Sequence, residues 1–529
     1  MTEFAWLVPL PVVIPLTAAG LALAMYRHAK VQQFITVTAL ALMVIVSGSM
    51  MIAADKGPLV VNVGEWAAPV GIILMGDRLS ALMLTVSSTV LLCVLLYSLG
   101  QGIADSRKSP ISIYHPTYLV LAAGVSNAFL AGDLFNMYVG FEILLAASYV
   151  LLTLGGTFER IRAGAIYVVV ALLSSLIFLI ALAMIYAATG TVNLAQLGER
   201  LAEIDPSVSI VIQSLLLLAF GIKAAIFPLS SWLPDSYPTA PAPVTAVFAG
   251  LLTKVGVYAI IRTQTLLFPD GRLDNVLMVL ALLTMLVGIL GAVAQDDIKR
   301  LLSFTLVSHI GYMIFGIALG SKIGLGAAIF YVAHHITVQT TLFLIVGLIE
   351  RRGGSTSLSK LGGLAKSAPF LAILFFIPAM NLAGIPPFSG FLGKVGLLEA
   401  GVDQGTGLAY VLVIGSVVAS LLTLYAIVKA WNKAFWQPAT EPLPDADLPK
   451  AMTGPATVMV VLGLLITVFA GPLYDYSDRA AATLMDNDRY ISAVLGSDGR
   501  GQGESTTLDG PEPVDESDLL DADVEGAVN

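Results

Sequence analysis

Uninterrupted apolar runs of about 20 residues recur along almost the whole length of this chain of 529 residues. An α-helix rises about 1.5 Å per residue, so a run of this length crosses the ~30 Å hydrocarbon core of a bilayer. Only 12% of the residues are charged, whereas soluble domains carry about 25%. The pattern predicts an all-α polytopic membrane protein embedded in the lipid bilayer, with no separate soluble catalytic domain.

The apolar runs, and the charged residues, glycines and prolines that bound them, predict about fourteen transmembrane helices. The first run has neither a basic leader nor a small-residue cleavage site, so we expect a retained helix and not a signal peptide. The stretch NLAQLGERLAEID, after the sixth span, predicts a short amphipathic helix at the membrane interface. The predicted spans cover residues 4–26, 34–54, 77–100, 113–131, 134–155, 163–188, 208–230, 241–268, 275–295, 302–320, 322–349, 367–398, 408–435 and 453–473.

Lysine and arginine are unevenly distributed between the two sets of alternate loops. The set that begins after the first span holds most of them, whereas the opposite set holds scattered single residues such as Lys56 and Arg272. Because cytoplasmic loops retain Lys and Arg, this asymmetry predicts a multi-pass protein of the cell membrane with both termini on the extracytoplasmic side. The basic residues of the first set are Arg27, Lys30, Arg107, Lys108, Arg160, Arg162, Lys299, Arg300, Arg351, Arg352, Lys360, Lys366, Lys433 and Lys450.

The acidic C-terminal segment and the single cysteine narrow the range of possible functions. Residues 497–529 contain ten acidic residues and one basic residue, which account for the whole formal net charge of −9 (1 − 10 = −9). This acidic segment is rich in Gly, Ser and Pro and is expected to be disordered, while a binding role for it stays open. Cys93 is the only cysteine, so an iron–sulfur cluster, a thiolate zinc site and an internal disulfide framework are excluded. We expect no cofactor, no bound metal and no nucleic-acid partner.

Four ionisable residues lie deep within predicted spans: Glu142, Lys223, Lys254 and Lys394. A charge at the bilayer centre costs at least ~2.5–3.5 kcal/mol, so such residues face protein or water and usually mark an ion path. We expect Glu142 to pair with Lys223, and the other lysines to continue a row of protonatable groups. A buried lysine can exchange its proton under the control of a nearby carboxylate, which arginine cannot do, and we expect no arginine at these depths. A fixed ion pair that only locks helix register is the alternative for Glu142 and Lys223.

Histidines provide a second set of candidates at mid-span. His334 and His335 are adjacent in IFYVAHHITVQTTLFLIVG, and His309 lies in FTLVSHIGYMIFG. Imidazole accepts and donates a proton near neutral pH, so these residues are candidate relay groups. Adjacent helical positions point to faces about 100° apart, which disfavours joint metal ligation. For His309, a hydrogen-bonded helix contact remains an equal alternative to a place in the relay.

Proline interrupts two of the spans beside a buried lysine. Pro228 follows Lys223, with Pro234 further on, and Pro386 and Pro387 precede Lys394. Proline frees a backbone carbonyl, which inside a membrane must be satisfied by protein or water, although a packing kink without function is the alternative. Interrupted helices in two halves predict inverted repeats with ion sites at mid-membrane. The predicted organisation is three helices in residues 1–112, one five-helix repeat in 113–268, a second in 275–435, a last helix at 453–473 and the acidic tail at 497–529.

The stretch FGIKAAIFPLSSWLPDSYPTAPAPVTAVFAGLLTKVGVYAI resembles the core signature of the antiporter-like subunits shared by Mrp-type cation/proton antiporters and respiratory complex I. Within that family, LFNMYVGFEILLAASYVLLTLGG, IYAATGTVNLAQL and FYVAHHITVQTTLFLIVGLIERRGGS look most like the D-type subunit of the Mrp antiporter. The resemblance covers the third to the thirteenth span. It implies that Glu142 and Lys223 form the charged pair of a first half-channel, that Lys254 connects the halves, and that Lys394 ends the second. His334 and His335 would be central relay groups.

The chain departs from that family pattern in several places. Many relatives carry a lysine in the histidine helix where this chain has Gln339, so the relay there would run through water and histidine. The M-type subunit of complex I resembles the chain but carries glutamate in place of Lys394, which argues against that type. The L and N types keep a lysine there and stay open, although the L type also bears a long lateral helix after its last span. The acidic tail is not part of the family pattern.

Three functions are compatible with these features. The first is a proton-translocating subunit of a multisubunit Na⁺/H⁺ antiporter, driven by the proton-motive force, with membrane partner subunits and Na⁺ and H⁺ as transported ions. The chain would then be a secondary transporter subunit and not an enzyme. The second is a proton-pumping subunit of an NADH:quinone oxidoreductase or a membrane-bound hydrogenase, and so part of an enzyme. The third, a structural scaffold, predicts that transport survives removal of Lys223.

Overall fold

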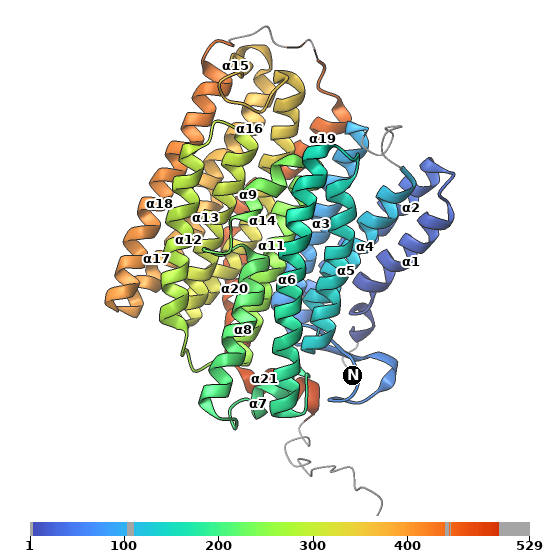
Figure 1. The fold of residues 1–529 in the computed structure, drawn as a ribbon, viewed down its shortest axis with the longest axis vertical. Helices are drawn as coiled ribbons and strands as arrows, with labels where there is room; N and C mark the ends of the chain where they lie inside the picture. Colours follow the sequence, from blue (N-terminus) through green and yellow to red (C-terminus); the bar gives the residue numbers. More distant parts are fainter. Residues whose placement is uncertain (1–3, 103–110, 440–443, 445, 497–529) are drawn as a thin grey trace, which may run out of the picture.

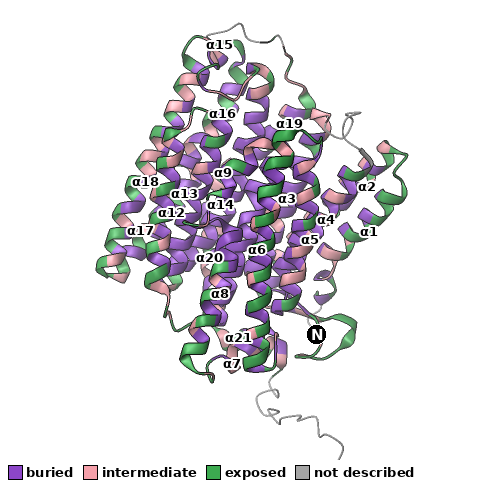
Figure 2. Ribbon diagram, in the orientation of Figure 1, coloured by how far each residue is buried: buried purple, intermediate pink, exposed green. Residues whose placement is uncertain are grey.

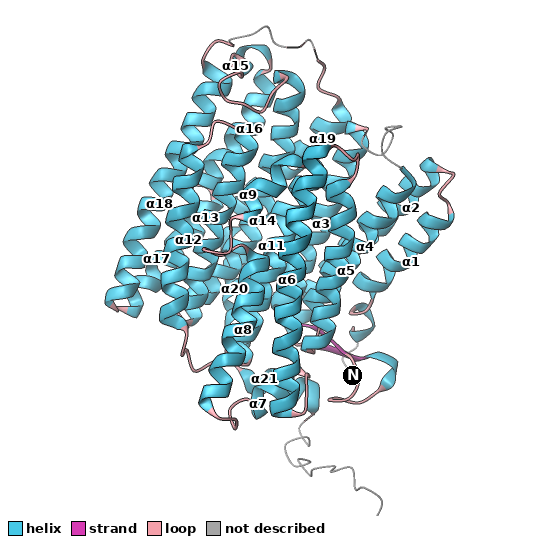
Figure 3. Ribbon diagram, in the orientation of Figure 1, coloured by secondary structure: helices cyan, strands magenta, loops and turns pink. Residues whose placement is uncertain are grey.

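The computed structural model describes residues 4–102, 111–439, 444 and 446–496 of the chain. It is almost wholly helical, and Figure 3 shows the two short strands beside one end of the helical bundle. The strands are β1 (Leu59–Asn62) and β2 (Ile73–Gly76), which pair antiparallel. The acidic tail lies outside the described residues.

The helices run along the long axis of the molecule (Figure 1). Their bounds are α1 Leu10–Ala24, α2 Ala29–Lys56, α3 Arg78–Gln101, α4 Ile111–Leu130, α5 Leu134–Thr153, α6 Phe158–Thr189, α7 Leu194–Arg200, α8 Pro206–Ala224, α9 Trp232–Ser236, α10 Ala242–Val247, α11 Thr253–Leu266, α12 Asp274–Ala294, α13 Ile298–Ala318, α14 Lys322–Gly353, α15 Leu364–Ser367, α16 Pro369–Ala383, α17 Ser389–Gln404, α18 Gly407–Trp431, α19 Lys450–Val468, α20 Ala470–Leu484 and α21 Asn487–Leu495.

The polytopic all-α architecture is confirmed. Twelve helices in the described part of the chain are long and apolar enough to cross a membrane. One of these is continuous from Ala242 to Leu266, because a π-helix, η5 (Phe248–Leu252), joins α10 to α11. Helix α4 and the interrupted pair α16 and α17 occupy the two remaining predicted spans. Each of the fourteen predicted spans therefore coincides with helix, and the predicted amphipathic segment forms α7.

Helix α14 forms the centre of the bundle, and its residues from Gly324 to Ile349 are all buried by protein. It packs against α3, α10, α13, α16, α17, α19 and α20. The span from Ala242 to Leu266 is equally enclosed, whereas most residues of α18 and α19 are partly or fully exposed. Figure 2 shows this contrast as a buried interior within an exposed rim. The candidate site residues on α11, α13 and α14 consequently lie in the part of the molecule furthest from lipid.

Polar side chains at the helix ends explain where several helices begin. Asp133, Thr157 and Asp297 accept hydrogen bonds from backbone N–H groups in the first turns of α5, α6 and α13. These caps satisfy donors that have no partner inside the helix. Two short helices after the last predicted span, α20 and α21, were not predicted, because they are amphipathic and too short to span a membrane. Figure 1 places α21 at the same end of the bundle as the start of the chain and opposite α15.

Glycines permit the closest helix contacts. A Cβ built on Gly288 of α12 would lie 2.4 Å from the backbone nitrogen of Ser308 on α13, a distance at which the helices must separate. By contrast, a Cβ on Gly20 of α1 would meet nothing within 4 Å. Small residues of this kind let membrane helices approach closely and gain van der Waals contact.

We expect Gly288→Val to destabilise the protein by about 1–3 kcal/mol, because overpacking forces the two helices apart. The measurement is the thermal denaturation midpoint of the purified protein in detergent. Gly20→Val is the matched control, and its midpoint should stay close to that of the wild type. Equal midpoints for the two variants would contradict the close contact between α12 and α13.

Candidate functional site

Lys223 lies in the last turn of α8, beside the first helix interruption. Its ammonium Nζ donates a hydrogen bond to Ser175 Oγ of α6 at 3.2 Å and stands 4.9 Å from the centroid of the Phe141 ring. The side chain is buried, and a cavity of about 20 Å³ beside it has room for one water molecule. An amine is thus held in an apolar setting by one hydroxyl and one aromatic face.

The interruption after α8 is supported by neighbouring groups. Ala225 has a positive φ of 61°, which ends the helix before Pro228. The Phe227 N–H donates to Thr284 Oγ1 at 3.1 Å, and Trp232 Nε1 donates to the carbonyl of Ile222 at 3.2 Å. These bonds satisfy backbone groups that lipid could not, as an irregular segment at membrane depth requires.

Glu142 lies in the middle of α5, next in sequence to Phe141. Its charge and that of Lys223 are near enough to interact, but their side chains form no ion pair among the described residues. Its buried Oε1 has no hydrogen-bond partner in this part of the chain. The direct contact expected from the sequence is therefore not formed in this conformation, because the Lys223 ammonium is bound to Ser175 instead.

Lys254 lies in the first turn of α11, directly after the π-helix η5. Its Nζ donates to the carbonyl oxygen of Ala249 at 2.7 Å, and the side chain is fully buried. A π-helix has one extra residue in its turn, and such turns are often found at functional sites. Its carbonyls become available to a side chain because the ordinary i to i−4 pattern is disrupted. Lys254 is thus held by the irregular turn of its own helix.

The three histidines lie close together but face different partners. His309 Nδ1 is 2.8 Å from the Tyr331 hydroxyl, and the His309 and His335 ring centroids are 5.2 Å apart. His334 turns the other way, with Nδ1 at 3.0 Å from Ser389 Oγ on α17. Both His335 ring nitrogens are buried without a partner among the described residues, and the ring lies near enough to Lys254 for an electrostatic interaction. Unpaired polar atoms of this kind are normally satisfied by internal water.

Lys394 lies beside the second interruption. Helix α16 ends at Ala383, Gly384 adopts a positive φ of 82°, and α17 begins at Ser389, after Pro386 and Pro387. Lys394 Nζ donates to the Ala383 carbonyl and to Ser420 Oγ, both at 3.0 Å, and stands 5.0 Å from the Tyr312 ring centroid. The carbonyl that the interrupted helix leaves free is therefore a ligand of the ammonium.

These contacts connect the second half of the site. The Tyr312 ring lies 5.5 Å from the His309 ring and 5.6 Å from that of Tyr331, so polar aromatic groups lead from Lys394 to the histidines. The structure thus brings Lys254, all three histidines and Lys394 into one cluster on α11, α13, α14 and α17. Glu142 and Lys223 form a separate group on α5 and α8.

The polar partners and one buried cation were not predicted from the sequence. Ser175, Tyr312, Ser389 and Ser420 carry no distinctive local pattern, because hydroxyl groups are common on membrane helices. The buried cation is Arg262, in the last turns of α11, which is 2% exposed and forms an ion pair of 2.7 Å with Asp77. The sequence signal that could have pointed to Arg262 is that it shares one predicted span with Lys254.

Asp133 is a further buried acid, located between α4 and α5 outside the spans. Burial raises the pKa of its carboxyl group to about 6, although backbone N–H groups oppose the shift.

Among the described residues, no group of three or more His, Cys, Asp or Glu side chains is arranged to hold a metal ion. Gln339 donates from Nε2 to the carbonyl of Leu302 at 2.8 Å, while its buried Oε1 is unpaired within the described chain.

Comparison with known proteins gives one consistent result. A family model described as NADH:quinone oxidoreductase/Mrp antiporter, TM, matches residues 131–423. The D subunit of a Na(+)/H(+) antiporter of Alkalihalophilus pseudofirmus is 39% identical over 497 residues, which cover 92% of this chain and 99% of that protein.

Comparison with solved structures leads to the same family. A chain of the Mrp complex from Dietzia sp. has a TM-score of 0.88 and 36% identity, covering 94% of this chain and 100% of that one. A chain of respiratory complex I from Thermus thermophilus has a TM-score of 0.77 and 26% identity, covering 91% and 99%. The fold and the buried charges define a polytopic ion-transport subunit. The chain belongs to the family of antiporter-like membrane subunits found in NADH:quinone oxidoreductases and Mrp antiporters, and within it to the D type.

We expect Gly384→Ala to weaken the second interruption. Its φ of 82° disfavours any residue with a Cβ, and the added carbon would lie 3.0 Å from Lys394 Nζ. Left-handed backbone costs such a residue roughly 1–2 kcal/mol, and crowding of the ammonium adds to this. The measurement is the denaturation midpoint in detergent. Gly454→Ala, in open space within α19, should be neutral or slightly stabilising. A neutral Gly384→Ala would show that the interruption does not need this backbone conformation.

Proposed function

We propose that this chain is a hydrogen-ion-translocating subunit of a multisubunit Na⁺/H⁺ antiporter driven by the proton-motive force. One observation supports this most directly: three lysines and three histidines within the membrane-spanning helices and their interruptions are all buried. Burying ionisable side chains within a membrane costs free energy, and apolar side chains would fill the same space without that cost. The names of the relatives at 34–39% identity agree with this function.

The mechanism that fits the geometry is an exchange of partners by Lys223. In this conformation its ammonium is bound to Ser175, while Glu142 is a near but unpaired neighbour. Movement of Lys223 toward Glu142 would stabilise a proton on the amine, and movement back toward Ser175 would favour its release. The change of charge would alter the electrostatic free energy of a proton on Lys254, and then on Lys394 through the histidines. A membrane potential of ~100 mV supplies about 2.3 kcal/mol per charge for this process.

The organisation proposed for the membrane part is two inverted repeats of five spans. The first would cover residues 113–268 (α4 to α11) and the second residues 275–435 (α12 to α18), after three spans in residues 1–112 and before the last at 453–473. Support comes from the two interruptions, each with a lysine beside it, in α8 and between α16 and α17. Related halves would place the two lysines in equivalent roles.

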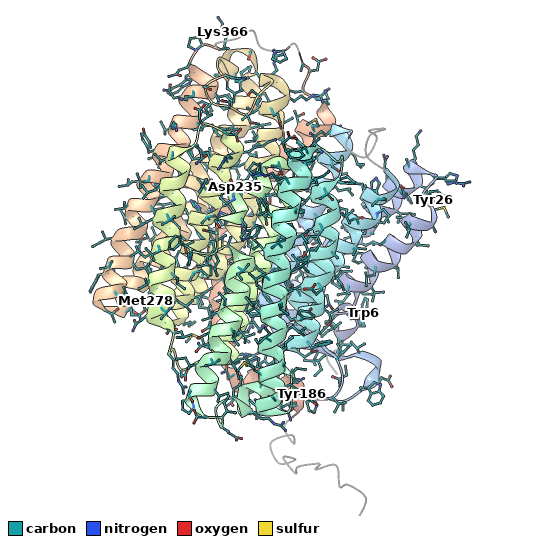
Figure 4. All side chains as sticks on the ribbon, viewed as in Figure 1. Trp6, Tyr26, Tyr186, Asp235, Met278 and Lys366 are labelled. Atoms are coloured by element: carbon teal, nitrogen blue, oxygen red, sulfur yellow. The ribbon has the colours of Figure 1, made fainter. Side chains whose placement is uncertain are left out.

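The chain is a multi-pass membrane protein, and its structural relatives are chains of multisubunit assemblies, so membrane partner subunits are expected. We infer a cell-membrane location with the α15 end of the bundle in the cytoplasm. Figure 4 places Lys366, one of the basic residues that face the cytoplasm by sequence, at that end and Tyr186 at the other. Sodium and hydrogen ions are the inferred transported ions.

A second function is favoured by the resemblance to complex I. A chain of the L or N type would move hydrogen ions in an NADH:quinone oxidoreductase or a membrane-bound hydrogenase, where redox chemistry elsewhere drives the same groups. Purification of the intact complex distinguishes the two. Iron–sulfur and flavin subunits that copurify would support the redox enzyme, and small membrane subunits alone would support the antiporter.

The decisive experiment compares Lys223→Ala and Glu142→Ala in everted membrane vesicles that contain the whole complex. Each variant should lower the rate of sodium-dependent dissipation of a pH gradient by about tenfold or more, because the relay loses its first charge. Lys30→Ala, an exposed lysine at the start of α2, is the control and should behave as the wild type. Exchange that persists in both variants at unchanged levels of assembled complex would exclude the proposed pathway.

A further inference from the structure

A large open cavity lies at the α15 end of the bundle, away from the cluster described above. Its volume is about 700 Å³, and its lining includes Gln101, Arg160, Thr239, Lys299, Glu350 and Thr356. These residues come from the ends of α3 and α14, the starts of α6 and α13, and the segments before α10 and after α14. Both charge signs line the cavity, so it holds water readily. It opens at the end of the molecule where the basic loop residues gather.

Two of the lining residues form an ion pair. Lys299 Nζ of α13 lies 2.7 Å from Glu350 Oε2 of α14, with exposed side-chain fractions of 10% and 44%. The carboxylate therefore faces the cavity water, while the lysine stem is enclosed by protein. The next residue, Arg300, turns outward to Asp235 at 3.0 Å, so it does not share the pair.

Polar groups continue inward from this pair toward the histidines. The Leu302 carbonyl, about one helical turn deeper than Lys299, accepts the hydrogen bond from Gln339 Nε2. Gln339 Oε1 is buried and unpaired within the described residues. His335 lies one turn further along α14, with both ring nitrogens also unpaired. Lys299, Gln339 and His335 thus form a descending series between the cavity and the relay.

A second buried group marks the same route. The Tyr97 hydroxyl of α3 has no hydrogen-bond partner among the described residues, although the side chain is fully buried. It lies against α14 at Gly347, where an added Cβ would be 2.5 Å from the hydroxyl oxygen. Gly347 is about one turn deeper than Glu350. An unpaired hydroxyl at this depth needs a water partner, which the adjoining cavity can supply.

The chemistry of the route selects hydrogen ions over metal cations. The groups beyond the ion pair are nitrogen bases and a single amide, which are poor ligands for a sodium ion. Sodium prefers a shell of several oxygen ligands, and no acidic cluster of that kind occurs among the described residues. A hydrogen ion can instead pass along water and single polar groups.

We propose that this cavity is the port through which hydrogen ions pass between the central histidines and the α15 face, and that the Lys299–Glu350 ion pair is its gate. The inference rests on the proposed function, because it assumes that the central cluster carries hydrogen ions. In the antiport direction the port releases hydrogen ions into the cytoplasm. Opening requires the pair to separate, so that water connects Gln339 to the cavity.

The test uses Thr239→Cys in the complete complex, in everted vesicles whose cytoplasmic face is outward. The bulky cationic thiol reagent 2-(trimethylammonium)ethyl methanethiosulfonate should slow sodium-dependent dissipation of the pH gradient about tenfold, because it fills the port with volume and positive charge. Wild-type vesicles, which carry only the buried Cys93 in this chain, should be unaffected. Ser367→Cys, exposed at the same end but outside the cavity, should react without loss of exchange.

A second arm examines the gate. Glu350→Gln should raise the sodium-independent leak of hydrogen ions several-fold, because the ion pair that closes the port no longer forms. The charge-swapped double variant Lys299→Glu with Glu350→Lys should restore a low leak, and an unchanged leak in Glu350→Gln overturns the gate. Modification of Thr239→Cys without loss of exchange overturns the port, and so does failure of the reagent to react, which would mean that a neighbouring subunit covers the cavity. Lys223→Ala in the same vesicles separates the two proposals. If it abolishes exchange while the cavity variants do not, the port is wrong and the proposed function stands.

Discussion

The cost of placing an ammonium group in a low-dielectric interior governs this structure. Each of the three central lysines is bound by oxygen: Lys223 by a serine hydroxyl, Lys254 by a backbone carbonyl, and Lys394 by both kinds of ligand. None of these three has a carboxylate within ion-pairing distance among the described residues. A neutral oxygen stabilises a charged amine only moderately. Lysines held in this way can lose and regain a proton, which a tight ion pair with a carboxylate would resist.

Backbone irregularity supplies much of that oxygen. A membrane helix normally uses every carbonyl for its own hydrogen bonds, so it has none to offer a side chain. The π-helix before Lys254 and the interruption before Lys394 release carbonyls at the depth where an ammonium must be held. The interruption after Lys223 acts differently, since side chains such as Thr284 and Trp232 satisfy its backbone groups. Each of the three irregular segments therefore lies next to a buried lysine, but only those beside Lys254 and Lys394 supply the ammonium with a backbone carbonyl.

The two kinds of buried cation have different roles. Arg262 stays protonated under all ordinary conditions, and its pair with Asp77 joins α11 to the start of α3 at the end of the bundle where the chain begins. Tyr490 of α21 stacks over the same guanidinium at 5.5 Å, so the C-terminal helices help to seal that end. At the opposite end Lys299 and Glu350 form a pair that faces water. One end of the bundle is thus held by a buried ion pair, and the other carries an ion pair that is partly exposed to water.

The sequence alone determined the class of the fold and the depth of the protonatable groups. Hydrophobic runs of spanning length have few folding options in lipid, because each backbone polar group must be satisfied within its own helix. That constraint made the fourteen helices, the two interruptions and the buried Glu142, Lys223, Lys254 and Lys394 predictable. Only the tertiary structure decided the partners. Whether Lys223 binds Glu142 or Ser175, which way His334 and His335 turn, and that Lys299 meets Glu350 all depend on how helices far apart in sequence rotate and pack, which the hydrophobic pattern of a single helix does not record.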